Sequence, residues 1–398
     1  MTLNPFETSS LPVPDPSSRQ TDRPWTWVDT PELLEELVRH VTAQPLAGVD
    51  TESDSFHHYR EQVCLIQIST PESDAIIDPL VLTDLSSLRP VFSDPAREWV
   101  MNGADYDIVC LKRDFGIHFG RMFDTVVAAQ LLGYPATGLA AMLERHFGLK
   151  VSKSFQRDEW FRRPLTPEQV SYALTDTRFL IPLRAILKGE LQGAGRLTWA
   201  EEEFQLLARR EWTREPFRPD DFWRIRGARD LGRREQLVLR ELAVMRDARA
   251  QEINRPPFKV MSDAVLLALA RLQPRSLSAL RRVRGISPLM ARRLGGPLLE
   301  AVRLGMEAEE TSLSPPRSGE RRRFDPSASR RLDALKEWRR LRSAGLKLDP
   351  GVLAPLSSLQ IVSRANPRTI DEMLALPELT RWRIHEFGVE WIATMTKG

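Results

Sequence analysis

The sequence predicts an α/β domain with a mixed sheet, followed by two smaller domains built only of helices. Short apolar strands come first and amphipathic helices follow between about residues 25 and 191, which is typical of an α/β layer. Beyond residue 230 the chain matches itself at a constant offset of 93 residues. A length of 398 residues also exceeds what one compact core usually spans, so several domains are expected.

The α/β domain begins with its strands. Apolar runs predict strands over 46–52, 63–69, 74–78 and 98–101, and we expect the first three to pair with one another. The apolar pattern predicts helices over 31–41, 105–115, 123–132 and 139–147.

A further helix begins after Thr166. The Thr166 side chain can cap it, Pro167 suits its first position, and Gln169 completes a capping box. We expect this helix to continue to about Leu187, with Pro182 as its first breaker.

The C-terminal half contains one small helical unit twice. Segments 235–305 and 328–398 align without a gap, which places Leu242 on Leu335 and Gly295 on Gly388. The segment between the repeats is rich in Pro, Ser and Arg, which is typical of a linker. The expected organisation is a disordered tail over 1–24, the α/β domain over 25–200, a connector over 201–230, helical domains over 231–306 and 328–398, and a linker over 307–327.

Charge is divided unequally along the chain although the net charge is only +3. Residues 1–210 contain 21 Lys and Arg against 30 Asp and Glu, whereas residues 211–398 contain 36 against 24. An acidic half joined to a basic half suggests that one holds metal ions and the other a polyanion such as nucleic acid. The alternative is that the arginines of the second half only solvate helix faces.

Cysteine content and targeting patterns indicate the compartment. The two cysteines, Cys64 and Cys110, lie in apolar surroundings, which argues against a disulfide framework and against a Cys-based zinc site. The N-terminal segment lacks the basic-then-apolar pattern of a secretion signal, and no apolar run approaches the length of a membrane span. We therefore expect a cytoplasmic protein that makes no membrane contact.

Two carboxylates stand at the end of the first predicted strand. Asp50 and Glu52 are two residues apart, so their side chains point to the same face of the sheet. Like charges this close repel each other unless a cation lies between them. The pair therefore predicts part of a metal site.

Three residues downstream can complete such a site. Asp107 lies where a predicted strand turns into a helix, and Tyr172 and Asp176 are spaced i and i+4 on the helix after Thr166. Hard divalent cations prefer oxygen ligands, and two of them can support phosphodiester hydrolysis. A phenol near carboxylates keeps its proton, so Tyr172 is expected to orient the attacking water, with partial proton acceptance open.

Each of these features alone has a common structural explanation. A D-x-E at a strand end is often a solvated turn, and a Tyr–Asp pair on a helix is often a local surface pair. An Asp at a strand–helix junction is often a cap, which is how we interpret Asp105. Asp54 and the pair His57-His58 are interpreted as loop residues.

Three sequence runs resemble the motifs of a known superfamily. The runs VDTES, NGADYDIVCL and YALTDTRFL resemble the three exonuclease motifs of the DEDD superfamily, and the Y-x-x-x-D form marks its tyrosine subclass. The intervening runs FDTVVAAQLL and LERHFGLKVSKSFQRDEW are similar to the bacterial ribonuclease D family. The two C-terminal repeats resemble HRDC domains, and the second is the more divergent because it lacks the Pro-Pro seen at Pro256-Pro257.

The resemblance implies a ribonuclease-H-like fold and a 3′→5′ exonuclease that releases nucleoside 5′-monophosphates. It implies that four carboxylates bind two divalent cations, Mg²⁺ or Mn²⁺, with Asp50 bridging them and Tyr172 beside the attacking water. The four are Asp50, Glu52, Asp107 and Asp176. The expected substrates are single-stranded 3′ ends of RNA, tRNA precursors above all, with no obligate protein partner.

Six residues are predicted to contact the substrate. They are Phe56, Gln67, Asn102, Arg163, Arg281 and Arg284. The cluster around Asp158-Glu159-Trp160 and Arg162-Arg163 could guide an incoming strand or form a surface patch of salt bridges. Two other functions stay open at this point: an exonuclease that acts on DNA, and a nucleic-acid adaptor without catalysis.

Overall fold

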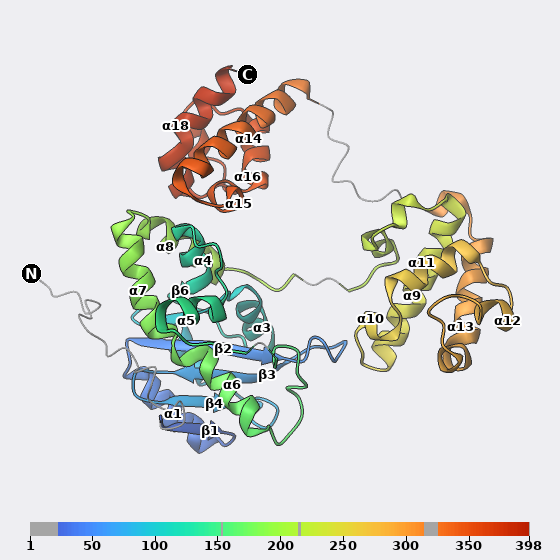
Figure 1. Cartoon of the computed structure of the whole chain (residues 1–398), viewed down its shortest axis with the longest axis horizontal. Helices are drawn as coiled ribbons and strands as arrows, with labels where there is room; N and C mark the ends of the chain where they lie inside the picture. Colours follow the sequence, from blue (N-terminus) through green and yellow to red (C-terminus); the bar gives the residue numbers. More distant parts are fainter. Residues whose placement is uncertain (1–22, 153, 214–215, 314–324, 398) are drawn as a thin grey trace, which may run out of the picture. The chain divides into compact units, whose positions relative to one another are not determined.

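The computed structural model describes residues 23–152, 154–213, 216–313 and 325–397. The chain forms two compact units. The first comprises the chain up to Ser53, Val63–Trp212 and Asp325–Gly398, and the second comprises Asp54–Gln62 and Thr213–Phe324 (Figure 1). The predicted tail over 1–24 falls outside the described residues except for its last two, as does 314–324 of the predicted linker.

A six-stranded mixed sheet lies at the centre of the first unit, as expected from the sequence. Its strand order is β1-β4-β3-β2-β5-β6, with β2 antiparallel to β3, β3 antiparallel to β4 and the other pairs parallel. The strands are β1 Trp25–Val28, β2 Leu46–Ser53, β3 Val63–Ser69, β4 Asp74–Ile77, β5 Glu98–Met101 and β6 Met122–Asp124.

The predicted helix over 123–132 is wrong at its start. Phe123 and Asp124 end β6, which pairs with β5, and the helix begins at Thr125. The Asp124 side chain caps this helix by accepting a hydrogen bond from the Val127 N–H. An Asp that leaves a strand and caps the next helix separates the two elements, although the apolar pattern runs through both.

Eight helices of the described chain surround this sheet. They are α1 Pro31–Thr42, α2 Leu88–Ser93, α3 Asp105–Phe115, α4 Thr125–Leu132, α5 Leu139–Phe147, α6 Pro167–Arg178, α7 Leu180–Gly193 and α8 Leu197–Ala208. The N-cap of α3 is Ala104, so Asp105 is not its cap; Asp105 lies in the first turn and forms an ion pair with Arg210.

The helix after Thr166 begins as predicted and ends earlier. Its capping box is present, with the Thr166 hydroxyl accepting from the Gln169 N–H and the Gln169 side chain accepting from the Thr166 N–H. It ends at Arg178, and α7 starts two residues later. Pro182 explains the break, because it has no N–H for the carbonyl of Arg178 and its ring clashes with that carbonyl.

The repeat is reproduced helix by helix. The first copy contains α9 Arg233–Glu252, α10 Pro257–Val260, α11 Asp263–Leu272, α12 Leu277–Leu280 and α13 Pro288–Glu307. The second contains α14 Pro326–Leu346, α15 Pro350–Leu353, α16 Leu356–Ala365, α17 Ile370–Leu374 and α18 Arg381–Lys397. Three 3₁₀ turns complete the description: Pro219–Arg224, Ala228–Asp230 and Glu310–Ser312.

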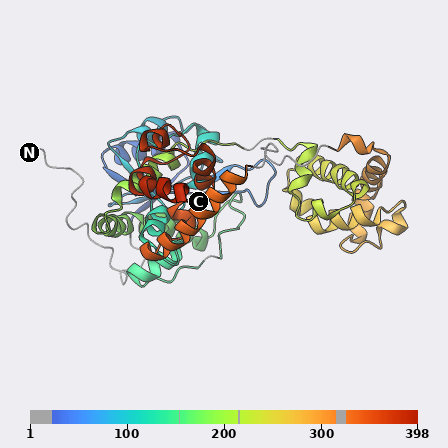
Figure 2. The same cartoon turned by 90° about the horizontal axis from the view of Figure 1, so that it is seen from above.

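Equivalent residues make equivalent contacts in the two copies. Arg246 donates to the carbonyl of Met261 at 3.1 Å, and Arg339, its counterpart at the 93-residue offset, donates to that of Ala354 at 3.0 Å. The second copy packs within the first unit, where α18 and α15 contact α8 and α4 of the α/β domain (Figures 1 and 2). The buried side chains of both form one hydrophobic core.

The contact between the second copy and the α/β domain is specific. Trp382 of α18 stacks on Trp199 of α8 with ring centroids 4.5 Å apart. The Glu202 carboxylate accepts hydrogen bonds from the first two N–H groups of α18, and Glu203 pairs with Arg383 at 2.5 Å. The first turn of α18 is therefore capped by a residue of the α/β domain. Among the helices of the described residues, none combines the length and apolar character that a bilayer span requires.

Candidate active site

Three carboxylates meet at one end of β2. Asp50 and Glu52 come from β2 and Asp176 from α6, and one oxygen of each lies within 4.8 Å of the others. Alternation along β2 brings the first two to one face of the sheet, and α6 lies across that face. Asp50 and Glu52 therefore lie on the same face of the sheet, and Asp176 lies opposite them.

Asp107 lines the same pocket from the first turn of α3. The Thr51 hydroxyl, located between the two acids of β2, donates a hydrogen bond to its Oδ1. The pocket has a volume of about 260 Å³ and is completed by the start of α5 at Gly138–Ala140 and by Ser152 and Gln156. All four predicted carboxylates thus border one cavity.

Tyr172 borders this cavity one helical turn before Asp176. Its hydroxyl donates a hydrogen bond to the Asp176 carboxylate, as the i, i+4 spacing allows. Its ring packs against Phe155 and Trp160, with centroids 5.7 and 5.9 Å away. These aromatic contacts hold the phenol at the edge of the acidic group.

The carboxylates lie close together and are buried (Glu52) or half-buried (the other three), which raises the pKa of each. Burial raises the pKa of Asp107 to about 6 and that of Asp176 to about 7. Burial, followed by the charges of Asp107, Asp176 and Glu52, raises the pKa of Asp50 well above its usual range. Burial and then the charges of Asp176 and Asp107 do the same to Glu52.

These residues suit a divalent cation. The donor set consists of carboxylate oxygens, which Mg²⁺ and Mn²⁺ prefer, and the four acids can ionise together only if positive charge offsets their repulsion. The pKa of the Tyr172 phenol is also raised, first by burial and then by Asp176, Glu52 and Asp50. Tyr172 therefore keeps its proton near neutral pH.

Asp124 supports the site and was missed from the sequence. It is fully buried, and its carboxylate accepts hydrogen bonds from the N–H groups of Ala104 at 2.7 Å and Val127 at 2.8 Å. It thereby ties β6 and α4 to the turn that precedes Asp107. Asn102 in that turn accepts a hydrogen bond from the Thr125 hydroxyl. The signal was an Asp at the end of a short strand, and it was missed because the sequence pattern predicted a helix over that strand.

The predicted substrate contacts lie in different places. Asn102 lines the acidic pocket. Gln67 pairs with Asp50 across β2 and β3, but its side chain is fully buried and its amide atoms have no partner in the described chain. Phe56 is 44% exposed and belongs to the second compact unit, as do Arg281 and Arg284. All six stay predictions.

The cluster around Trp160 consists of salt bridges. Arg163 forms a two-pronged ion pair with Asp78, at 2.6 and 2.8 Å, and also donates to the carbonyls of Trp160 and Cys64. Arg162 pairs with Glu159 at 2.5 Å. The guanidinium of Arg163 is therefore engaged within the fold. His57 and His58 lie in the loop that follows β2, as expected.

Comparison with known families agrees with this architecture. Residues 25–192 match the family described as 3′-5′ exonuclease, and residues 235–302 and 328–395 each match the HRDC domain. The fold and the acidic site together define a 3′→5′ exonuclease of the DEDD superfamily that carries HRDC domains.

Similar proteins identify the family within this class. Ribonuclease D of Escherichia coli is 33% identical over 291 residues, which cover 73% of this chain and 77% of that protein. Ribonuclease D of Desulfotalea psychrophila is 29% identical over 84% of this chain and 89% of its own length. The chain belongs to the ribonuclease D family of 3′→5′ exoribonucleases.

Solved structures support the same assignment. The structure of E. coli RNase D, described as an exoribonuclease involved in structured RNA processing, matches with a TM-score of 0.69 at 28% identity. The match covers 94% of this chain and 99% of that one. The catalytic core of RRP6 from Trypanosoma brucei matches with a TM-score of 0.66 at 31% identity, over 72% and 82% of the two chains.

Proposed function

We propose that this protein trims single-stranded 3′ ends of RNA, releasing nucleoside 5′-monophosphates, with two divalent cations held by Asp50, Glu52, Asp107 and Asp176. The observation that carries the proposal is the approach of three carboxylates to within 4.8 Å, with the fourth on the same pocket. Bound Mg²⁺ or Mn²⁺ would supply the positive charge that stabilises the phosphate and the departing 3′ oxygen.

The four carboxylates have different places in this proposal. Asp50 would hold the cations together with the other three acids, whose charges all raise its pKa. Glu52 and Asp176 approach it from β2 and α6, and Asp107 approaches from α3 with Thr51 as its hydrogen-bond donor. Tyr172 orients the attacking water through its phenol oxygen, since its raised pKa keeps it protonated at neutral pH and therefore not available to accept a proton.

We propose that the first HRDC domain supplies most of the affinity for RNA. Between Asp263 and Glu300 the sequence contains seven arginines and no acidic residue, and all seven are exposed. They are Arg271, Arg275, Arg281, Arg282, Arg284, Arg292 and Arg293. At the 93-residue offset, three of these positions hold Leu374, Ala375 and Pro377 in the second domain. Phosphate contacts of this kind are independent of sequence.

The proposed physiological substrates are tRNA precursors with 3′ extensions, and the proposed compartment is the cytoplasm. The substrate class rests on membership of the ribonuclease D family and on the basic first HRDC domain. The compartment rests on the low cysteine content of the chain, which has two cysteines, both buried, and so lacks the disulfide framework typical of secreted proteins.

A digestion assay tests the proposal. Full-length protein is incubated with RNA and DNA of one sequence and with a tRNA precursor, each labelled at its 3′ end, in Mg²⁺, Mn²⁺ or chelator. We expect metal-dependent release of 5′-monophosphates from RNA, and none from Asp50→Ala or Asp176→Asn. Asp105→Asn is the matched control, because this acid lies in the same turn as Asp107 but is exposed and pairs with Arg210.

The same assay separates the other functions. Faster release from DNA than from RNA would make DNA the substrate. RNA binding that is unchanged in chelator, with no release in any metal, would indicate an adaptor. Retained activity in Asp50→Ala or Asp176→Asn would contradict the assignment of the metal ligands.

A further inference from the structure

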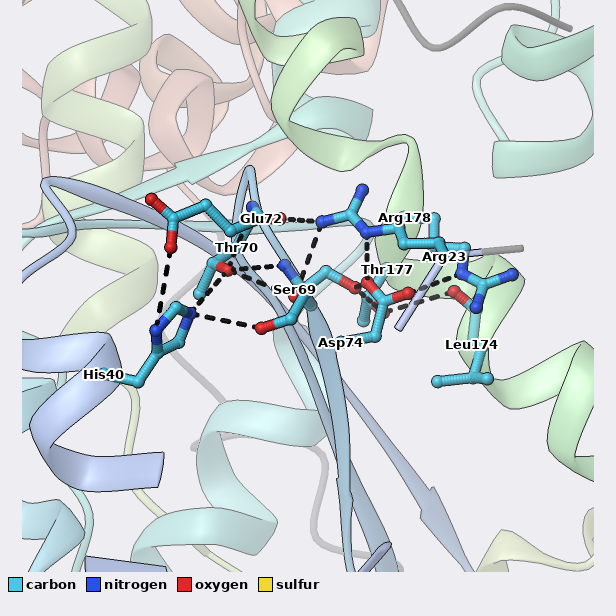
Figure 3. Close-up of polar contacts among 10 residues, drawn as sticks. Arg23, His40, Ser69, Thr70, Glu72, Asp74, Leu174, Thr177 and Arg178 are labelled. Atoms are coloured by element: carbon cyan, nitrogen blue, oxygen red, sulfur yellow. Dashed lines mark hydrogen bonds and ion pairs between the residues drawn. The ribbon is translucent and has the colours of Figure 1, made fainter. Parts of the chain in front are cut away.

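The two residues that follow Asp176 point into the sheet. Thr177 and Arg178 form the end of α6, and both side chains are buried, with 0% and 8% of their surface exposed. The Thr177 hydroxyl lies 2.7 Å from the hydroxyl of Ser69 at the end of β3 (Figure 3). The last turn of α6 is thus attached to a strand directly beside the candidate metal ligand.

Asp74, the first residue of β4, binds Arg178. Its carboxylate accepts a hydrogen bond from Nε of Arg178 at 2.6 Å and another from the Ser69 hydroxyl at 2.7 Å (Figure 3). Arg23 approaches the same carboxylate, with its Nε 3.3 Å from Oδ1. Asp74 is 2% exposed, so the pair is shielded from water and is screened little by salt.

These anchors lie on the face of the sheet that carries the acidic site. Asp50 pairs with Gln67 on β3, and Asp74 pairs with Ser69 two residues further along. Since alternate residues share a face, Asp50 and Glu52 lie on the same side of the sheet as Ser69 and Asp74, the residues that bind the end of α6. Gly48 of β2 lets α6 approach closely, because an added Cβ would lie 3.0 Å from the carbonyl oxygen of Thr177.

Asp176 lies at a position where the contacts of Thr177 and Arg178 with Ser69 and Asp74 can keep its carboxylate in place. It lies in the last turn of α6, where helices fray because the final carbonyls have no intrahelical partner. The charges of Asp50 and Glu52 also repel it when all three are ionised. Both effects would move Asp176 away from the site unless the residues next to it were held.

We propose that Asp74 and Arg178, together with Ser69 and Thr177, are positioning residues for the metal site. They hold the last turn of α6 against β3 and β4, so that the Asp176 carboxylate stays within reach of Asp50 and Glu52. This inference rests on the proposed metal ligands and adds residues that touch neither the substrate nor the cation. Partners that orient a metal ligand typically change metal affinity or activity by about 10- to 100-fold when they are removed.

A second buried ion pair in the same unit is a matched control. Arg184 of α7 pairs with Glu98 of β5 at 2.5 Å, and their side chains are 3% and 6% exposed. Like Arg178 and Asp74, they join a helix to a strand, but α7 carries none of the proposed ligands. A purely structural role predicts similar consequences for the two pairs.

The test compares Arg178→Met, Asp74→Asn, Thr177→Val and Arg184→Met in the full-length protein. Two properties are measured: the rise in Tm on adding Mg²⁺, which needs no turnover, and the Mg²⁺ concentration that gives half-maximal release of nucleotides. For Arg178→Met we expect that concentration to rise about tenfold or more, a smaller Mg²⁺-induced rise in Tm, and a nearly unchanged KM for RNA.

The control variant should distinguish an effect on the position of Asp176 from a general loss of folding stability. Arg184→Met is expected to lower Tm in chelator but to keep the Mg²⁺ dependence of the parent. Thr177→Val, which removes only a hydroxyl, should shift the Mg²⁺ dependence in the same direction as Arg178→Met by a smaller factor. If Arg178→Met does not fold, Asp74→Asn and Thr177→Val provide the same comparison.

Two negative results have different meanings. A parent protein whose Tm and turnover are independent of both Mg²⁺ and Mn²⁺ would contradict the proposed function itself. A parent that depends on Mg²⁺, with variants at Asp74, Thr177 and Arg178 whose Mg²⁺ dependence equals that of Arg184→Met, would overturn only the positioning role.

Discussion

The Thr51 hydroxyl donates a hydrogen bond to Oδ1 of Asp107, across the gap between β2 and α3. Thr51 lies between Asp50 and Glu52 in the sequence, so one strand provides two of the proposed ligands and the donor that holds a third. Asp107 is half-buried, and this bond lowers its pKa against the opposite effect of burial. Asp50 and Glu52 therefore line the site directly, and Thr51 between them supports it through Asp107.

Replacing Thr51 tests this relationship. Thr51→Val preserves the branched shape that suits a strand but removes the hydroxyl. We expect the free energy of unfolding to fall by about 1 kcal/mol, the net value of one hydrogen bond, and the Mg²⁺ requirement to rise about tenfold. Thermal melts and Mg²⁺ titrations of activity measure both. Thr51→Ser, which keeps the hydroxyl, should resemble the parent; equal behaviour of the two variants would refute the role.

The raised carboxyl pKa values predict how the metal-free protein responds to pH. A carboxyl whose pKa is higher in the folded state favours folding below its unfolded pKa, near 3.8, and this contribution is lost as pH rises through the folded value. With Asp107 at about 6 and Asp176 at about 7, the loss falls between about pH 4 and pH 7.

Melting curves in chelator measure this effect. Asp176→Asn cannot ionise, so relative to the parent it should gain stability as the pH rises from 5 to 8. Addition of Mg²⁺ at pH 8 should raise the Tm of the parent more than that of the variant. A difference in Tm between parent and variant that stays constant from pH 5 to pH 8 would show that Asp176 is not repelled by its neighbours.

Tyr172→Phe separates water orientation from general-base catalysis. Removal of a true general base typically slows a reaction by about 100-fold or more. Because the pKa of Tyr172 is raised, we expect it to orient water rather than accept its proton, and a smaller decrease in kcat should follow. Single-turnover rates and RNA binding are the measurements, with binding nearly unchanged. A decrease well above 100-fold would make Tyr172 the base, and an unchanged rate would remove its role.

Arginines of the first HRDC domain are expected to contribute to the affinity for RNA and not to the rate of phosphodiester hydrolysis. Arg281→Ala combined with Arg284→Ala should weaken RNA binding and reduce the slope of log K against log salt by about 1.4 to 1.8, since each phosphate contact contributes about 0.7 to 0.9. Arg303→Ala is the control in the same domain, because that arginine pairs with Glu300 and Glu307. An equal salt dependence in the double variant and the control would exclude the phosphate contacts.

Local patterns account for what the sequence predicted well. The alternation of Asp50 and Glu52 and the i, i+4 spacing of Tyr172 and Asp176 each lie within one element, so spacing alone indicated a shared face. The repeat also needed only the sequence: all five helices of one copy start 93 residues before their counterparts in the other, and the Arg246 and Arg339 contacts coincide.

Features that depend on distant residues were not predictable in the same way. The strands β1 and β6 have four and three residues and gain their definition from pairing with β4 and β5. The roles of Asp124 and Asp74 depend on partners 20 and 104 residues away. No local pattern contains such pairs, because folding of the whole domain brings them together.

The two HRDC domains provide a last prediction, since the same position has different surroundings in each. Trp382 is buried against Trp199, whereas Leu289, its counterpart at the 93-residue offset, is 48% exposed. Trp382→Ala should cost about 3–5 kcal/mol, because it removes a large buried ring and leaves a cavity. Leu289→Ala should change stability by about 0.5 kcal/mol or less, as surface substitutions do. Denaturant unfolding of the full-length chain measures both values. Similar small values for both variants would mean that the second domain is attached only by its linker and not by α8.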